Sequence, residues 1–233
     1  MARQYCGTLG KVENCQVGVF AAYASRQGYA LVDKRLFLPE LWFSEAYAER
    51  RQKCQVPDAV AFQTKPQLAA AMVKALRNEG CLPFQYLVAD CLYGNSPDFL
   101  DAIDACVGVT ALVSVPADTR CWLQRPPTRE KTYTYKGAVH AKRVVASATQ
   151  APLTVTALAG SLPSSAWYCR TVSEGTKGPI VYAFARTRVT LCKEGLPERT
   201  VWLVIKRTLG ASPTYSYYIS NAPASTPLRL FVW

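Results

Sequence analysis

One acidic residue of this chain stands where α/β folds usually place chemistry. Asp90 follows a short apolar segment, residues 84–89, and precedes a turn at Gly94. The segment predicts a buried strand, while Ser96 and Pro97 predict the cap and the first turn of the next helix. A strand fixes a carboxylate at its carboxyl end while the following loop stays open. Asp90 is therefore the leading candidate for chemistry. The alternative, that it only caps the next helix, is weakened because Ser96 already fills that role.

The elements that must position Asp90 follow an α/β pattern. Apolar and β-branched residues at 15–24 and 28–38 predict a hairpin. Apolar residues four positions apart predict a helix, which Thr64 caps and Gly80 ends. Residues 119–195 show no helical periodicity and predict a β-rich region. The expected elements are strands at 15–24, 28–38, 84–90, 109–115, 200–209 and 214–220, and helices at 40–53, 64–79 and 96–106.

The positive charge of the chain is concentrated in one region. The net charge is +11, and residues 119–210 carry 15 Lys and Arg against four acidic residues, which accounts for the whole excess. A localised basic surface favours a polyanion such as nucleic acid. The alternative is a solvated face that keeps the protein soluble, although such a face normally includes both signs of charge.

Basic residues interleaved with aromatic ones are the candidates for DNA contact, since charged tips beside rings suit phosphate contacts and base stacking. Lysines on exposed strands also protect edges against aggregation, which is the structural alternative. The predicted DNA-binding residues are Lys131, Lys136, Lys142, Arg143, Lys206 and Arg207, with Tyr133 and Tyr135 as neighbours.

The nine cysteines and the single histidine predict no metal–thiolate site. No two cysteines lie within four residues of each other, whereas zinc sites need close pairs. Buried, reduced thiols are expected, and strand alternation places Cys91 on the buried face opposite Asp90. His140 lies in a basic segment and is expected at the surface. A cysteine-dependent enzyme that pairs His140 with a thiol stays open as an alternative.

Six segments of the chain, in order, resemble successive blocks of DDE-type insertion-sequence transposases. They are residues 3–11, 14–20, 31–39, 62–66, 89–94 and 217–223. The resemblance implies an α/β fold: an RNase H-like mixed sheet with flanking helices, interrupted by a β-rich insertion and incomplete at both ends. It implies core residues 1–118 without their first strand, a basic insertion at 119–198, and returning core strands at 199–233 without the closing helix.

The same resemblance implies three catalytic carboxylates, of which only Asp90 has a counterpart in this sequence. Asp90 would be both catalytic residue and metal ligand. Asp33 matches a non-catalytic position, and its neighbours Lys34 and Arg35 suggest a solvated strand edge. Two-metal cleavage of a phosphodiester needs several converging carboxylates. We therefore expect Mg²⁺ to serve the complete enzyme without being bound productively by this chain.

These observations predict a fragment of a transposase that cuts and pastes DNA, inactive on its own. The alternative is a non-catalytic DNA-binding or regulatory protein derived from a transposase. The expected partners are DNA, at transposon ends and target, and a second copy of the chain or a full-length relative. No run approaches the roughly 18 apolar residues of a membrane helix, and no secretory signal is evident. We expect a cytoplasmic, nucleoid-associated bacterial protein.

Overall fold

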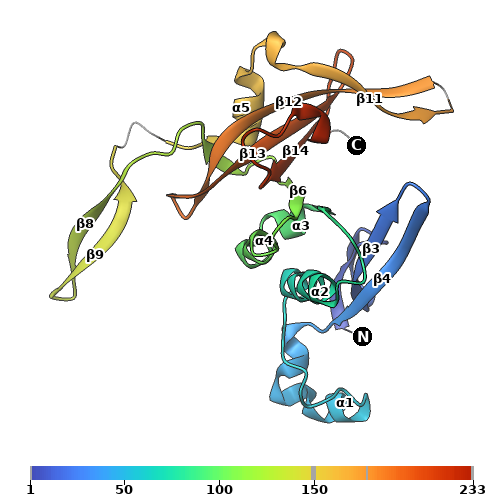
Figure 1. Ribbon diagram of the computed structural model, residues 1–233. Coiled ribbons are helices and arrows are strands. Elements are labelled where there is room, and N and C mark those ends of the chain that lie inside the picture. The colour runs from blue at the N-terminus through green and yellow to red at the C-terminus, as the bar shows by residue number, and fades with distance from the viewer. Residues whose placement is uncertain (1, 148–150, 177, 232–233) are drawn as a thin grey trace. The chain divides into compact units, whose positions relative to one another are not determined.

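The computed structural model describes residues 2–147, 151–176 and 178–231 (Figure 1). The chain forms two compact units, and each has its own helices and strands. The first unit contains the residues up to Phe84 together with Ser96–Val107, and the second contains Gln85–Asn95 and the residues from Gly108 onward. Both helices and a large mixed sheet are present, which confirms the predicted mixed α/β fold class.

Two antiparallel hairpins form the strands of the first unit. The strands are β1 (Ala2–Cys6), β2 (Lys11–Cys15), β3 (Val17–Ser25) and β4 (Gly28–Phe37). Strands β3 and β4 pair from Val17–Phe37 to Ser25–Gly28, with a register shift after Ala21. The hairpin predicted from the apolar runs around residues 25–28 is thus confirmed.

The helices of the first unit begin and end where local chemistry requires. Thr64 and Gln67 form a capping box at the start of α2, and Gly80 ends this helix at φ 66°, a conformation that glycine adopts easily. Helix α2 packs against α4 and against β3. The helical elements are η1 (Glu40–Phe43), η2 (Glu45–Tyr47), α1 (Ala48–Lys53), α2 (Lys65–Glu79) and α4 (Pro97–Asp104). The predicted helix at 40–53 is therefore broken into three short pieces.

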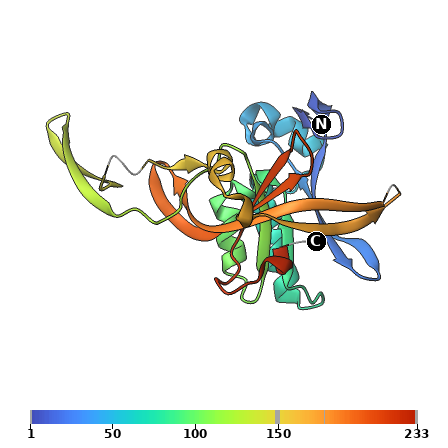
Figure 2. The same ribbon diagram turned by 90° about the horizontal axis from the view of Figure 1, so that it is seen from above.

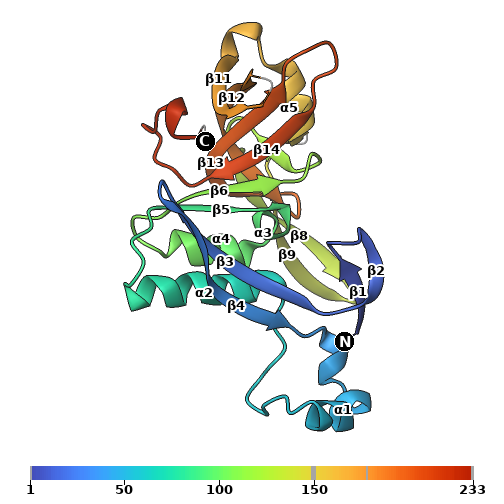
Figure 3. The ribbon, with the colours of Figure 1, turned by 90° about the vertical axis from the view of Figure 1, so that its right-hand side faces the viewer.

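The second unit is built on an eight-stranded sheet. Its order is β10-β7-β12-β13-β14-β6-β5, and β11 also pairs with β12. The pairing of β5 with β6 is parallel, as Figure 3 shows, and the other pairings are antiparallel. The strands are β5 (Tyr86–Ala89), β6 (Thr110–Val115), β7 (Arg120–Trp122), β10 (Leu153–Thr154), β11 (Tyr168–Gly175), β12 (Gly178–Lys193), β13 (Leu196–Thr208) and β14 (Tyr215–Ser220).

Two further strands, β8 (Thr128–Tyr135) and β9 (Ala138–Val145), form a separate antiparallel ribbon. Figure 2 shows it in yellow-green. Within the described chain these strands pair only with each other. Nearly all of their side chains are exposed. The ribbon therefore gains its order from its own ladder of hydrogen bonds more than from burial.

The core of the second unit lies where β6, β13 and β14 run side by side. Val113, Leu203, Ile205 and Ile219 are almost completely buried. A separate apolar cluster contains Leu112, Phe184, Trp202, Val204, Ala222 and Phe231. Burial of such side chains contributes roughly 1.5–3 kcal/mol each, so these strands hold the sheet together.

One helix of the second unit was not predicted. Helix α5 (Val155–Ser161) lies within residues 119–195, where no helix was expected, and Thr154 caps it by accepting from the Ala157 N–H. Its seven residues make only two turns, too few to show a 3.6-residue period. It forms because Val155 and Leu158 are buried. None of the helices in the described residues combines the length and apolar character that a bilayer crossing needs.

Candidate functional site

Asp90 lies directly after β5, at the carboxyl end of the strand. Its side chain is exposed, and its Oδ1 accepts a hydrogen bond from the Leu92 N–H at 2.9 Å. This bond caps a one-turn helix, α3 (Cys91–Gly94). Ser96 caps the next helix, α4, through the Phe99 N–H. The expectation that Ser96 leaves no capping role for Asp90 was wrong, because the chain contains two successive helix starts.

Gly94 allows this turn to pack tightly against β6. It is buried, and a Cβ atom at this position would lie 2.0 Å from the backbone oxygen of Ser114. No side chain fits at that distance without a shift of the backbone. The glycine of the Asp-Cys-Leu-Tyr-Gly segment thus has a packing role, and it holds Asp90 at a defined place on the sheet.

Tyr93 is the titratable neighbour of Asp90. Burial, and after it the negative charge of Asp90, raise the pKa of the Tyr93 hydroxyl above its usual value. The phenol therefore stays protonated at neutral pH. The turn presents a carboxylate beside a neutral hydroxyl.

Cys91 is exposed, contrary to the prediction that it is buried. Strand alternation ends at Ala89, and Cys91 is already the first residue of α3. All nine cysteines lie in the described residues and are free thiols, but only Cys106 and Cys121 are buried. The expectation of buried thiols was therefore wrong for most of them. Burial raises the pKa of the Cys121 thiol to about 11, with a smaller effect from Cys192.

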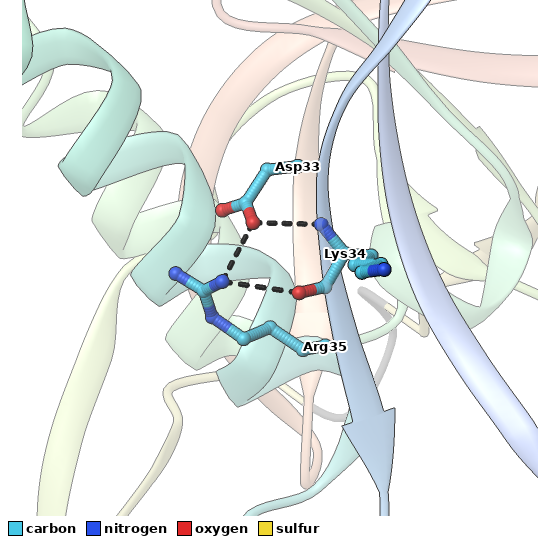
Figure 4. Close-up of polar contacts among 3 residues, drawn as sticks. All are labelled: Asp33, Lys34 and Arg35. Carbon is cyan, nitrogen blue, oxygen red and sulfur yellow. Dashed lines mark hydrogen bonds and ion pairs between the residues drawn. The ribbon is translucent and has the colours of Figure 1, made fainter.

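Asp33 is engaged by its own strand neighbours (Figure 4). Its Oδ1 accepts from the Lys34 N–H and from the Arg35 guanidinium, both at 2.6 Å, and Arg35 also donates to the Lys34 carbonyl oxygen. The carboxylate is partly buried. The Asp33 side chain is only 17% exposed, so the expected solvated strand edge is wrong for this residue. That Asp33 has no catalytic role stays a prediction.

A site for divalent metal ions is not assembled by the residues that the structure describes. No group of three or more His, Cys, Asp or Glu side chains among residues 2–147, 151–176 and 178–231 is arranged to hold an ion. Asp90 alone does not fit a two-ion site, since such a site requires several converging oxygen ligands.

The β8–β9 ribbon brings some of the predicted DNA-binding residues together. Lys131 and Lys142 are opposite each other in the register and share one face. Lys136 lies in the turn, with its Nζ 5.5 Å from the centre of the Tyr135 ring. Arg143 points to the other face, where its Nε donates to Thr128 Oγ1 at 2.8 Å.

Lys206 and Arg207 lie elsewhere, on β13 of the large sheet, and both are partly buried. As consecutive strand residues they point to opposite faces. The Lys206 Nζ lies 4.8 Å from the centre of the Tyr182 ring, and the Arg207 guanidinium lies 3.9 Å from that of Trp167. They do not form one patch with each other.

Two further residues of the ribbon, Arg129 and His140, were not among the predicted DNA-binding residues, although His140 was expected at the surface. Arg129 shares the face of Lys131 because the two are two positions apart on one strand. His140 is opposite Tyr133, and their rings stack with centres 5.5 Å apart. The sequence could have placed Arg129 and His140 beside Lys131. A hairpin that turns at Lys136-Gly137 puts alternate residues of both strands on the same face.

The segment at 217–223 ties the end of β14 to β6. The Asn221 side chain accepts from the Ala111 N–H at 2.8 Å and donates to the Val109 carbonyl oxygen at 3.4 Å. The Pro223 carbonyl oxygen accepts from Trp202 Nε1 at 3.0 Å. This segment therefore has a structural function in the described fold.

Comparison with known proteins identifies the family of this chain. The family model of the DDE superfamily endonuclease matches residues 1–179. A probable transposase for insertion sequence element IS701, from Microchaete diplosiphon, is 35% identical over 103 residues, which are 44% of this chain and 23% of that protein. The chain thus matches less than a quarter of the length of this relative. The predicted resemblance to DDE-type insertion-sequence transposases is confirmed, and the chain belongs to the DDE superfamily endonuclease family.

Proposed function

We propose that this chain is part of a transposase that cuts and pastes DNA, with Asp90 as one of its catalytic carboxylates. The observation that supports this most directly is the place of Asp90. It is exposed at the carboxyl end of β5, in a turn that Gly94 packs against β6. This is where a scaffold can hold a carboxylate rigidly and leave it open to solvent.

In the complete enzyme, Asp90 would be one of several ligands of a divalent ion, through the oxygen that the Leu92 N–H does not use. Family members generally use divalent metal ions, and we propose Mg²⁺ for the complete enzyme. Such ions activate water and stabilise the leaving oxygen in phosphodiester cleavage. The hydrogen bond from Leu92 fixes the orientation of the carboxylate. The protonated Tyr93 adds no negative charge beside it.

We further propose that this chain does not cleave DNA by itself. The reason is chemical: one carboxylate does not position two ions, and the described residues contain no group of three or more His, Cys, Asp or Glu side chains that could hold an ion. We keep the division into core (1–118), basic insertion (119–198) and returning strands (199–233) as part of this proposal. The partners would be transposon ends and target DNA, with a second copy or a full-length relative, at the bacterial nucleoid.

A second candidate function is favoured by the ribbon. A non-catalytic DNA-binding or regulatory protein derived from a transposase needs basic surface and no metal site. Residues 128–145 expose Lys131, Lys142 and Arg129 on one face. Both candidates bind DNA, and they differ in whether Asp90 binds a metal ion.

The experiment that separates them titrates Mn²⁺ into isotopically labelled protein and follows the broadening of amide signals by NMR. We expect broadening of Cys91 and Leu92 in the wild type. Asp90→Asn should lose it while keeping the helix cap, because asparagine caps as well as aspartate does. Asp58→Asn, at an exposed loop position, is the matched control and should leave the broadening unchanged.

Three outcomes are informative. Broadening that survives Asp90→Asn would overturn the metal role of Asp90 and favour the non-catalytic candidate. Nicking of supercoiled plasmid by this chain with Mg²⁺, lost in Asp90→Asn, would overturn the proposed inactivity. Absence of salt-dependent binding to any DNA would sink both candidates.

A further inference from the structure

The β8–β9 ribbon has the dimensions of an element that enters a groove. Each strand has eight residues, and the register runs without interruption from Thr128–Val145 to Tyr135–Ala138. At about 3.3 Å per residue the strands are roughly 26 Å long, and they lie about 4.8 Å apart. Both faces are largely exposed. The ribbon is therefore a narrow, double-sided element.

Charge is divided unequally between the two faces. Alternation and the register place six functional side chains on one of them, which we name the basic face: Arg129, Lys131, Tyr133, Tyr135, His140 and Lys142. On the opposite face Glu130 is directly opposite Arg143, so their charges balance. In residues 128–145, all of which the structure describes, the basic face carries three cations and no carboxylate.

The aromatic rings of the basic face pack on one another and on the lysines. Tyr133 and His140 stack at 5.5 Å with an interplanar angle of 27°, and the Lys142 Nζ lies 5.4 Å from the centre of the Tyr133 ring. Tyr135 is tilted against His140 with ring centres 6.2 Å apart. Rings already covered in this way are poor platforms for unstacked bases. The basic face instead presents the cationic side chains beside a layer of stacked aromatic rings.

We infer that the basic face of the β8–β9 ribbon binds in the major groove of duplex DNA. This inference rests on the proposed function, that the chain acts on DNA. The major groove is about 12 Å wide and admits a two-stranded ribbon, whereas the minor groove of straight B-DNA is about 6 Å wide and takes such an element only where the duplex is bent or kinked. Arg129, Lys131 and Lys142 would contact phosphates at the groove edges. Tyr133 and His140 would face the base edges.

The test measures binding of the full chain to a fluorescent 20-base-pair duplex, and to one of its strands, between 50 and 200 mM KCl. Lys131→Gln and Lys142→Gln should each weaken duplex binding several-fold. Each should also reduce the slope of log affinity against log salt by about 0.9, the value for one lost phosphate contact. Lys74→Gln, at an exposed position of α2, is the matched control and should leave the slope unchanged. Arg143→Gln removes one charge from the opposite face of the ribbon and should weaken binding less than Lys131→Gln.

The groove itself is tested by competition. Methyl green, which occupies the major groove, should displace the protein, whereas netropsin, which occupies the minor groove, should not. Displacement by netropsin alone would overturn the assignment of the groove. Tighter binding to the single strand than to the duplex would overturn the choice of duplex DNA.

The remaining outcomes separate this inference from the proposed function. The basic face is not the DNA contact if the wild type binds duplex DNA and Arg143→Gln weakens binding as much as Lys131→Gln. The same conclusion follows if none of the three ribbon variants weakens binding. In that case DNA binding itself stands. If the wild type binds no DNA, the proposed function fails as well. Circular dichroism of each variant checks that the fold is retained.

Discussion

Basic side chains of the large sheet and of the β8–β9 ribbon have different surroundings. On the sheet, the Arg186 guanidinium lies 4.4 Å from the centre of the Trp202 ring and donates to the Thr226 carbonyl oxygen. Arg188 lies over the same ring and donates to the carbonyl oxygens of Ala222 and Thr200. On the ribbon, by contrast, Lys131 is exposed.

The difference divides the charge excess of residues 119–210 into two groups of cations, for which we propose two purposes. Arg186 and Arg188 fasten the segment around residues 221–231 to the sheet. Arg186 donates to the Thr226 carbonyl oxygen and lies over the Phe231 ring, and Arg188 donates to the Ala222 carbonyl oxygen. The ribbon cations have surfaces left for a partner. A count of charges alone does not separate these purposes. Changes on the sheet should therefore alter stability, and changes on the ribbon should alter binding.

The largest effect is expected where the sheet is packed most closely. Gly94→Ala should destabilise the second unit by about 3 kcal/mol, since the new methyl group meets the Ser114 carbonyl oxygen at 2.0 Å. Urea unfolding followed by tryptophan fluorescence measures this. Gly160→Ala, in α5 with open space around it, is the control and should change stability by less than about 1 kcal/mol. Equal effects of both changes would contradict the packing role of Gly94.

Arg186→Ala should lower the free energy of unfolding by about 2 kcal/mol, because it removes a cation–π contact and a charged hydrogen-bond donor from a partly buried site. The same change at Arg129, on the exposed ribbon, should cost less than about 0.5 kcal/mol. Chemical denaturation of the two variants measures the difference. If Arg129→Ala destabilises as strongly as Arg186→Ala, the comparison between sheet and ribbon breaks down.

Stability should also fall at high pH because of Cys121. Burial raises the pKa of this thiol from 9.0 to about 11. Below pH 9 the thiol is protonated in the folded and the unfolded chain. Between pH 9 and 11 the unfolded chain loses its proton first, so the folded state loses about 1–2 kcal/mol of stability, and the loss levels off above pH 11.

The difference in unfolding free energy between wild type and Cys121→Ala, followed across pH 8–11, isolates this effect from other titrating groups. It should shrink as the pH rises. Val189→Ala, which truncates a buried side chain that carries no titratable group, should give a difference independent of pH. A constant difference for Cys121→Ala would mean that its pKa is not raised.

The smallest effect on stability is expected on the ribbon. The double change Lys131→Gln and Lys142→Gln should alter the thermal unfolding midpoint by no more than about 1 °C, because both side chains are exposed. Differential scanning calorimetry measures it. A large fall in the midpoint would show that the ribbon packs against another part of the protein, and loss of DNA binding could then not be assigned to lost contacts.

Much of the fold could be predicted because its signals are local. The capping box of Thr64 and Gln67 and the stop at Gly80 depend on residues within four positions of each other. The strand that ends before Asp90 was recognisable by its apolar residues, but its predicted burial was wrong, because β5 is an edge strand in which Tyr86 and Val88 are exposed. The missed helix α5 and the cap at Asp90 concern elements of seven and four residues, which are too short for a periodic pattern.

The sequence by itself determined the family, the position of Asp90 after a strand, and the location of the charge excess. Only the tertiary structure decided which basic side chains are exposed and can contact a partner. Aromatic rings that are distant in the sequence cover some of these side chains. Arg207 is covered by Trp167, and the Asn221 side chain bonds to Ala111, 110 residues earlier. Cys91 became exposed because a new helix starts at Asp90. Contacts between residues so far apart in the sequence depend on how the strands pair. No local pattern of residues specifies that pairing.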